Sequence, residues 1–206
     1  MKRKMEQALI AWKDKNNRKP LLLTGARQVG KTYLLKQFGM DQFKNVAYFN
    51  LEIDGSVASY FNETIEPFKL IRYLEASAEI KITAGETLII LDEIQVSERA
   101  LTSLKYFCEQ CPKYHIIGAR SLLGVAIHRQ RYSFPVGKVE SKTLYPLDFE
   151  EYLWARNKNR LCEEIKTSYE TMTPPTRRIA PESNRSLSRI FDRRRNARKR
   201  KSFSES

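Results

Sequence analysis

The chain has 206 residues, 41% of them hydrophobic, and a formal net charge of +13. This length suits one domain with an appendage, and the apolar content is sufficient for a packed core. Three cysteines cannot build a disulfide framework, no signal peptide follows the basic N-terminus, and no apolar run approaches the roughly 18 residues of a membrane helix, so we expect a cytoplasmic protein with no membrane partner.

The first predicted element is an amphipathic helix over residues 2–16. Met5, Leu9 and Trp12 recur in it at helical spacing. We expect this helix to pack beside the first strand, which is predicted by the apolar run at residues 20–24.

A glycine-rich loop follows that strand and matches the Walker A pattern G-x-x-x-x-G-K-[ST] at every fixed position. Its members are Gly25, Ala26, Arg27, Gln28, Val29, Gly30, Lys31 and Thr32. Helical spacing over residues 33–38 comes next, and Gly39 is the predicted end of that helix. A strand, a glycine loop and a helix in this order bind phosphate, so we interpret the segment as the phosphate loop of a nucleotide-binding protein.

The residue types in the loop indicate how phosphate would be held. Gly25 and Gly30 permit backbone angles that a Cβ forbids, so several N–H groups can turn toward one anion. The N-terminus of the following helix adds a partial positive charge. We expect Lys31 to reach the β- and γ-phosphates and the Thr32 hydroxyl to ligate Mg²⁺.

The remaining elements alternate between strands and helices. Strands are predicted at residues 45–51, 87–91, 114–118 and 139–144. Helices are predicted at residues 67–80, 97–110, 121–127 and 148–156. This order predicts an α/β fold of the P-loop NTPase class, an open parallel sheet with helices on both faces. Ligands of such sheets lie at the carboxyl ends of the strands.

Two carboxylates end the most apolar of these strands. Asp92 and Glu93 follow the run Leu88-Ile89-Ile90-Leu91, about 60 residues after the phosphate loop. Asp92 is predicted to lie near the Mg²⁺ that Thr32 ligates. Glu93 points elsewhere and is the candidate that orients or deprotonates the attacking water.

Three hypotheses follow from these motifs. The first is an enzyme that hydrolyses ATP with Mg²⁺ and couples hydrolysis to a conformational change. An Asn-Lys-x-Asp guanine-reading motif is absent from the sequence, which favours ATP over GTP. The second is a non-catalytic nucleotide-binding fragment, or a nucleic-acid-binding protein that uses the basic runs at residues 193–201. The third is a small-molecule kinase, which shares the phosphate loop.

Both motifs and the segments around them resemble a bacterial and archaeal family of AAA-type P-loop ATPases. The resemblance covers roughly residues 1–173 and rests on residues 21–32, 91–95, 121–125, 134–139 and 144–147. It implies an ATPase that forms homo-oligomers, with Ser121 as the sensor of the γ-phosphate. Arg129 and Arg131 are candidates for an arginine offered to a neighbouring subunit. The chain departs from the family at Arg120, where relatives usually have glycine.

The resemblance stops abruptly near the C-terminus, so we expect a core at residues 1–165 and a basic tail at residues 166–206. Residues 167–206 carry 11 Lys and Arg against 4 Asp and Glu and have few apolar residues, which predicts disorder. The tail is either a genuine basic extension or the product of a truncation or frameshift. Relatives usually continue into a further C-terminal domain, and without it we expect ATP binding with slow hydrolysis.

Overall fold

The computed structural model describes residues 2–121 and 137–173. Contacts within it divide the chain into two compact units. The larger, Arg3–Pro146, is called the sheet unit below. The other contains Leu147 onward together with Met1–Lys2. The predictions of a helix at residues 121–127 and of a disordered tail lie outside the described residues, apart from Ser121 and residues 166–173.

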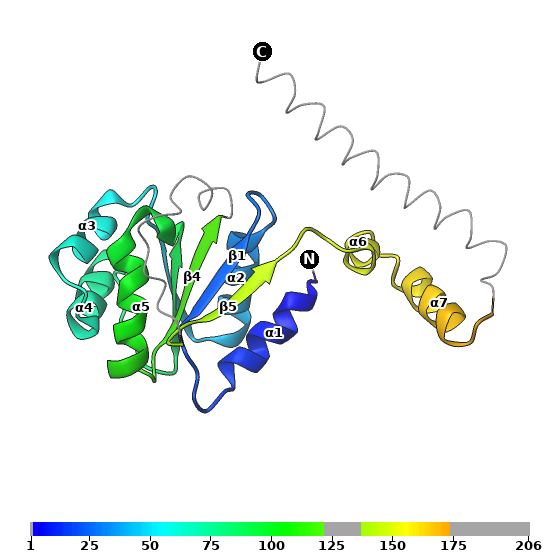
Figure 1. Ribbon diagram of the computed structural model, residues 1–206, viewed down its shortest axis with the longest axis horizontal. Coiled ribbons are helices and arrows are strands. Elements are labelled where there is room, and N and C mark those ends of the chain that lie inside the picture. Colours follow the sequence, from blue (N-terminus) through cyan, green and yellow to red (C-terminus); the bar gives the residue numbers. More distant parts are fainter. Residues whose placement is uncertain (1, 122–136, 174–206) are drawn as a thin grey trace, which may run out of the picture. The chain divides into compact units, whose positions relative to one another are not determined.

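A five-stranded parallel sheet forms the centre of the sheet unit, which confirms the predicted α/β fold (Figure 1). The spatial order of the strands is β2-β3-β4-β1-β5. Their bounds are β1 Leu21–Gly25, β2 Asn45–Asn50, β3 Thr87–Asp92, β4 His115–Ser121 and β5 Glu140–Leu144. All five predicted strands are therefore present, four of them within one residue of their expected ends, while β4 extends three residues further than predicted.

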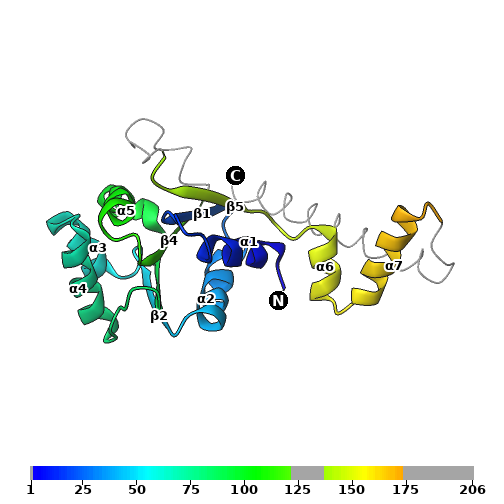
Figure 2. The ribbon, with the colours of Figure 1, turned by 90° about the horizontal axis from the view of Figure 1, so that it is seen from below.

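Helices cover both faces of this sheet. One face carries α1 (Lys4–Lys13) and α2 (Lys31–Gln42). The other carries α3 (Gly55–Glu63), α4 (Pro67–Ala78) and α5 (Glu98–Gln110), which lie together on one side in both views (Figures 1 and 2). The short 3₁₀ helix η1 (Ile94–Val96) joins β3 to α5.

Burial on both faces of the sheet explains why the sequence of strand β3 is apolar without interruption. Every residue from Thr87 to Asp92 is buried. Successive side chains alternate between the two faces, so that Leu88 and Ile90 join the core under α1 and α2, while Ile89 and Leu91 join the core under α3 to α5. A strand covered on both faces requires apolar residues at consecutive positions.

Helix α2 is longer than its sequence predicts. Gly39 was expected to end it, but the helix continues to Gln42. A Cβ on Gly39 would lie 2.6 Å from Cγ2 of Val46 and 3.3 Å from Cδ2 of Leu88. The glycine is therefore a point of close contact between α2 and the sheet rather than a helix terminator.

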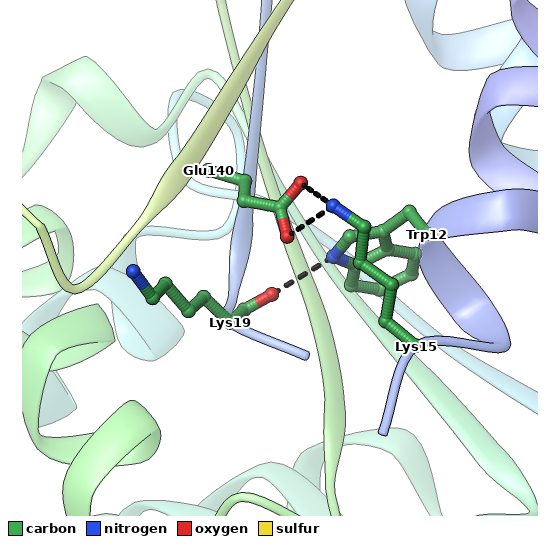
Figure 3. A network of polar contacts seen from close by, with 4 residues as sticks. All are labelled: Trp12, Lys15, Lys19 and Glu140. Atoms are coloured by element: carbon green, nitrogen blue, oxygen red, sulfur yellow. Dashed lines mark hydrogen bonds and ion pairs between the residues drawn. The ribbon is translucent and has the colours of Figure 1, made fainter. Parts of the chain in front are cut away.

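Helix α1 is tied to the beginning of the sheet by polar contacts (Figure 3). Trp12 is 1% exposed, and its indole N–H donates to the carbonyl of Lys19 across 2.8 Å. Lys15 forms an ion pair with Glu140, the first residue of β5, at 2.8 Å. Because these contacts hold its C-terminal half, α1 has a fixed orientation against the sheet.

The sequence analysis missed two helices. Helix α3 buries only Val57 and Phe61, which are one turn apart, so its periodic signal is short. Helix α7 (Asn159–Glu170) belongs to the second unit, where it buries Leu161 and Cys162 against Leu153 of α6 (Phe149–Ala155). Helix α6 itself was predicted. The division into a core at residues 1–165 and a tail stays a prediction.

Ser97 and Asp148 confirm that helix starts can be read from the sequence. The Ser97 hydroxyl accepts from the backbone N–H of Ala100, as expected of an N-cap. Asp148 accepts from the N–H of Glu151, whose carboxylate accepts from the N–H of Asp148 in return. Among the described helices, none is long and apolar enough to cross a bilayer.

Candidate nucleotide-binding site

The predicted site residues lie at one edge of the sheet. In the parallel register Gly25 at the end of β1 lies opposite Ser121 of β4 and Leu144 of β5. Asp92 ends β3 on the other side of β4. Because all five strands are parallel, their carboxyl ends share this edge, and the loops that follow them converge there.

Of the two loop glycines, Gly30 adopts a backbone angle that a Cβ disfavours, as predicted, whereas Gly25 ends β1 without a positive φ. Gly30 has φ 96°, and Gln28 also adopts a left-handed conformation at φ 62°. A Cβ on Gly25 would lie 2.5 Å from the carbonyl oxygen of Leu144, so only glycine allows β1 to end so close to β5. Ala26, Arg27, Gln28 and Gly30 are exposed, which leaves the loop open to a ligand from solvent.

Lys31 is held inside this loop. Its side chain is 6% exposed, and the ammonium donates to the carbonyls of Gly25 at 3.2 Å and Ala26 at 3.0 Å. An ammonium has three protons to donate, so one remains for a phosphate oxygen. The charge is thus positioned beside the backbone N–H groups that the loop presents.

A hydrogen bond joins the loop to the end of β3. The Thr32 hydroxyl donates to Oδ2 of Asp92 across 2.6 Å, and Asp92 is 1% exposed. The other carboxylate oxygen, Oδ1, accepts from the backbone N–H of Glu93 at 3.0 Å. The structure therefore brings together the two residues that were predicted to bind Mg²⁺.

These two side chains fit a magnesium ion of the P-loop type. Hydroxyl and carboxylate oxygens are ligands that Mg²⁺ prefers. The described residues contain no cluster of three or more His, Cys, Asp or Glu side chains that could hold a metal ion. A site made of Thr32 and Asp92 would accordingly leave positions for water and phosphate oxygens, as Mg²⁺ sites on nucleotides do.

Tyr48 is part of the site although the sequence analysis did not identify it. Its hydroxyl donates to Oδ2 of Asp92 at 3.1 Å, the oxygen that Thr32 also contacts. Burial, followed by the negative charge of Asp92, raises the pKa of Tyr48 to about 12. The Lys36 ammonium lies 3.6 Å from the centre of the ring. Tyr48 therefore remains a protonated donor throughout the physiological pH range.

Glu93 follows directly after β3, and the expectation that its side chain points away from Asp92 stays a prediction. Glu93 has a left-handed backbone conformation with φ 52°, which redirects the chain directly after the strand. The Gln95 side-chain amide donates to Oε2 of Glu93, and Glu93 is half-buried. One carboxylate oxygen is thereby held in place while the other can accept a proton.

Ser121 and Arg120 bring unsatisfied polar atoms to the same edge. Ser121 is 7% exposed, and its Oγ has no hydrogen-bond partner among the described residues. The buried Nε of Arg120 likewise has none in that part of the chain, and burial lowers the pKa of this guanidinium. The predicted γ-phosphate contact of Ser121 stays a prediction. Arg129 and Arg131 lie outside the described residues.

Arg3 is a second residue that the sequence analysis missed. It immediately precedes α1 and is 4% exposed. Its guanidinium donates to the carbonyl of Val29 in the phosphate loop and to the carbonyl of Tyr145 just after β5. These partners are 26 and 142 residues away, so no local pattern could have revealed the contact.

Comparison with protein families gives one match. Residues 17–153 match the model of a family described as an AAA domain. The matched region spans more than half of the chain and includes the phosphate loop, Asp92, Glu93 and Ser121. No curated protein sequence matches the chain.

Several solved structures resemble the fold at low sequence identity. A Walker-type ATPase of Pyrococcus abyssi is 18% identical with a TM-score of 0.47, over 80% of this chain and 62% of that one. The C. elegans protein PCH-2 is 15% identical with a TM-score of 0.43, over 81% and 46%. A Drosophila ORC bound to DNA is 12% identical with a TM-score of 0.46, over 77% and 50%. The chain thus spans less than two thirds of each of these structures.

Proposed function

The chain belongs to the AAA domain family, and on this premise we propose that it binds ATP with Mg²⁺ and hydrolyses it to ADP and phosphate. The observation that carries this proposal is the 2.6 Å hydrogen bond between Thr32 and Asp92, formed directly beside the buried Lys31. A phosphate-binding loop and a metal-binding carboxylate are in contact before any ligand is considered. A loop that served only as a turn would not require this contact.

The phosphates would be held by the loop from Gly25 to Thr32. Backbone N–H groups of the loop and of the first turn of α2 supply neutral donors, and the helix N-terminus supplies partial positive charge. Lys31 supplies the full charge, and its two contacts to loop carbonyls keep it from swinging into solvent. These groups recognise the triphosphate rather than the base.

Thr32 and Asp92 would hold the metal ion. Bound Mg²⁺ would neutralise negative charge on the β- and γ-phosphates. Asp92 keeps its orientation because both carboxylate oxygens are engaged, Oδ1 by the N–H of Glu93 and Oδ2 by Thr32 and Tyr48. We expect Asp92 to act through water, since Mg²⁺ retains several waters.

Glu93 is the proposed general base. Its Oε2 accepts from the Gln95 amide, and we expect the carboxylate to lie near the γ-phosphate, where its other oxygen takes a proton from water. Ser121, whose hydroxyl has no partner within the described part of the chain and whose backbone lies opposite Gly25, is the proposed γ-phosphate sensor. Hydrolysis would be coupled to a conformational change, and a homo-oligomer would supply an arginine from a neighbouring subunit.

Phosphate release from ATP by the 206-residue chain tests this function. We expect Mg²⁺-dependent release that Asp92→Asn abolishes and that EDTA suppresses. The matched control is Asp41→Asn on the exposed side of α2, where Asp41 accepts from Gln37, and it should leave release unchanged. Binding of Mg·ATP without any release, in the presence or absence of DNA, would support a nucleotide-binding fragment instead.

A further inference from the structure

Arg3 is a buried arginine to which the proposed catalytic steps give no role. Arginine is rarely buried unless its charge is paired or hydrogen-bonded. At 4% exposure Arg3 is more buried than Lys31, the lysine of the phosphate loop. Two of its hydrogen bonds go to backbone carbonyls, one of which belongs to the phosphate loop.

The guanidinium bridges two segments at the functional edge of the sheet unit. It donates through one terminal nitrogen to the Val29 carbonyl at 3.2 Å, and through the other to the Tyr145 carbonyl at 2.6 Å. The first nitrogen also lies 4.0 Å from the place that a Cβ on Gly30 would occupy. Arg3 therefore packs against the turn of the loop that leads into α2.

The contact to Val29 fixes the orientation of one particular peptide group. The Val29 carbonyl and the Gly30 N–H belong to the same trans peptide, in which C=O and N–H point in opposite directions. Holding the carbonyl toward Arg3 therefore turns the Gly30 N–H to the opposite side of the peptide, away from Arg3. The positive φ of Gly30 allows this orientation without strain.

Arg3 is itself fixed in place. Its backbone N–H donates to the carboxylate of Glu6 at 3.0 Å in the first turn of α1.

We propose that Arg3 is a positioning residue of the phosphate site, which holds the Val29–Gly30 peptide so that the Gly30 N–H donates to a bound phosphate. The inference rests on the proposed nucleotide function and deepens it. The ligand chemistry is the phosphate chain of a nucleoside di- or triphosphate. The competing explanation is that Arg3 is a structural tie that affects only stability.

Titration calorimetry with Mg·ADP separates the two explanations. Arg3→Met removes the charge and the donors, and we expect a roughly 10- to 100-fold higher Kd, as for loss of a hydrogen bond from a charged group. Arg3→Lys keeps the charge but cannot bridge two carbonyls with a planar fork, so its Kd should be intermediate. Trp12→Phe is the matched control. It removes a buried N–H donor on the helix that follows Arg3, and the partner of that donor is also a backbone carbonyl.

The Gly30 amide gives a direct readout that stability does not affect. In the folded parent chain, its NMR resonance should shift strongly when Mg·ADP is added. In Arg3→Lys the shift should be reduced, whereas in Trp12→Phe it should be unchanged. The proposal is overturned if Arg3→Met and Arg3→Lys bind Mg·ADP as the parent does, or if Trp12→Phe weakens binding equally. A parent chain that does not bind Mg·ADP, or a Lys31→Ala variant that binds it normally, would refute the nucleotide function itself.

Discussion

Thr32 and Asp92 are 60 residues apart in sequence, and their side chains meet in a 2.6 Å hydrogen bond. The first lies at the start of α2 and the second at the end of β3, two strands away from β1. Asp92 is almost wholly buried, so its carboxylate exchanges no such bond with bulk water. A pre-formed pair of this kind reduces the reorganisation that metal binding requires, since one ligand already orients the other.

Lys31→Ala should abolish tight binding of Mg·ATP. Lys31 is the buried cation of the loop, and without it the phosphate charge would be left unmatched. Titration calorimetry of the variant measures the effect directly. Lys69→Ala, which removes an exposed lysine paired with Glu66, serves as the control and should bind like the parent. Unchanged affinity in Lys31→Ala would contradict the role of the loop.

Glu93→Gln should bind ATP and fail to hydrolyse it. The substitution retains size and hydrogen-bonding capacity but removes the base, which contributes about 10²- to 10⁴-fold in enzymes that use one. Single-turnover phosphate release, measured beside ATP affinity, separates the two effects. Glu86→Gln, at an exposed acid paired with Lys44, should retain both. Turnover at the parental rate in Glu93→Gln would mean that another group activates the water.

Tyr48→Phe should weaken the affinity for Mg²⁺ and leave the Mg²⁺-free affinity for nucleotide unchanged. The variant removes one of the two hydroxyl donors on Oδ2 of Asp92, and a lost hydrogen bond of this type is worth about 1 kcal/mol. We expect the Mg²⁺ concentration for half-maximal ATP binding to rise roughly fivefold, with Mg²⁺-free binding unchanged. Tyr60→Phe removes a similar hydroxyl contact, to Ser77 on α4, and should change neither. An unaltered Mg²⁺ titration of Tyr48→Phe would show that Tyr48 is not needed to orient Asp92.

His115 should make the protein less stable as the pH falls. Burial, and then the nearby charge of Arg18, lowers the pKa of His115 to about 4, with its ring packed against Trp12 and Phe43. Between the ordinary value of about 6.5 and this lowered pKa, the unfolded chain binds a proton that the folded chain does not. The stabilisation that depends on neutral His115 is therefore complete above its ordinary pKa and is lost progressively as the pH falls toward 4. The loss between pH 7 and pH 5 should be roughly 2 kcal/mol.

Urea unfolding at the two pH values measures this loss. His115→Gln should remove most of the pH dependence whatever its effect on stability at pH 7. His128→Asn, at the only other histidine in the sequence, should preserve it. A His115→Gln variant with the parental pH dependence would assign the effect to other groups.

Local sequence patterns predicted the parts of the fold that depend on neighbours in the chain. The apolar run before Asp92 predicted a strand buried on both faces, and Ser97 predicted a helix start, because each signal lies within a few residues. The sequence predicted that the phosphate loop and Asp92 form one site only because their spacing matches a known arrangement. Their contact itself depends on the order of the strands.

The misses share a physical cause. Gly39 was taken for a helix end because a glycine signals flexibility in sequence, whereas its role comes from Val46 and Leu88 on the sheet. Tyr48 and Arg3 joined the site through tertiary contacts to partners at least 26 residues away. Single-sequence patterns contain no information about such distant partners, so contacts of this kind become visible only in the folded chain.

The order of the strands also constrains how the protein is made. Strand β1 pairs only with β4 and β5, which begin at His115 and Glu140, while β2 pairs with β3 across about 40 residues. Closing the longer loops is entropically more costly, so β2 and β3 should associate earlier. On a ribosome, β1 would wait for its first partner until β4 ends at Ser121 and for its second until the chain reaches Leu144 at the end of β5, so the phosphate loop would be completed last. Nucleotide could then stabilise only nascent chains that had already passed this length, and pulse-labelled hydrogen exchange should show late protection of Leu22 and Leu23.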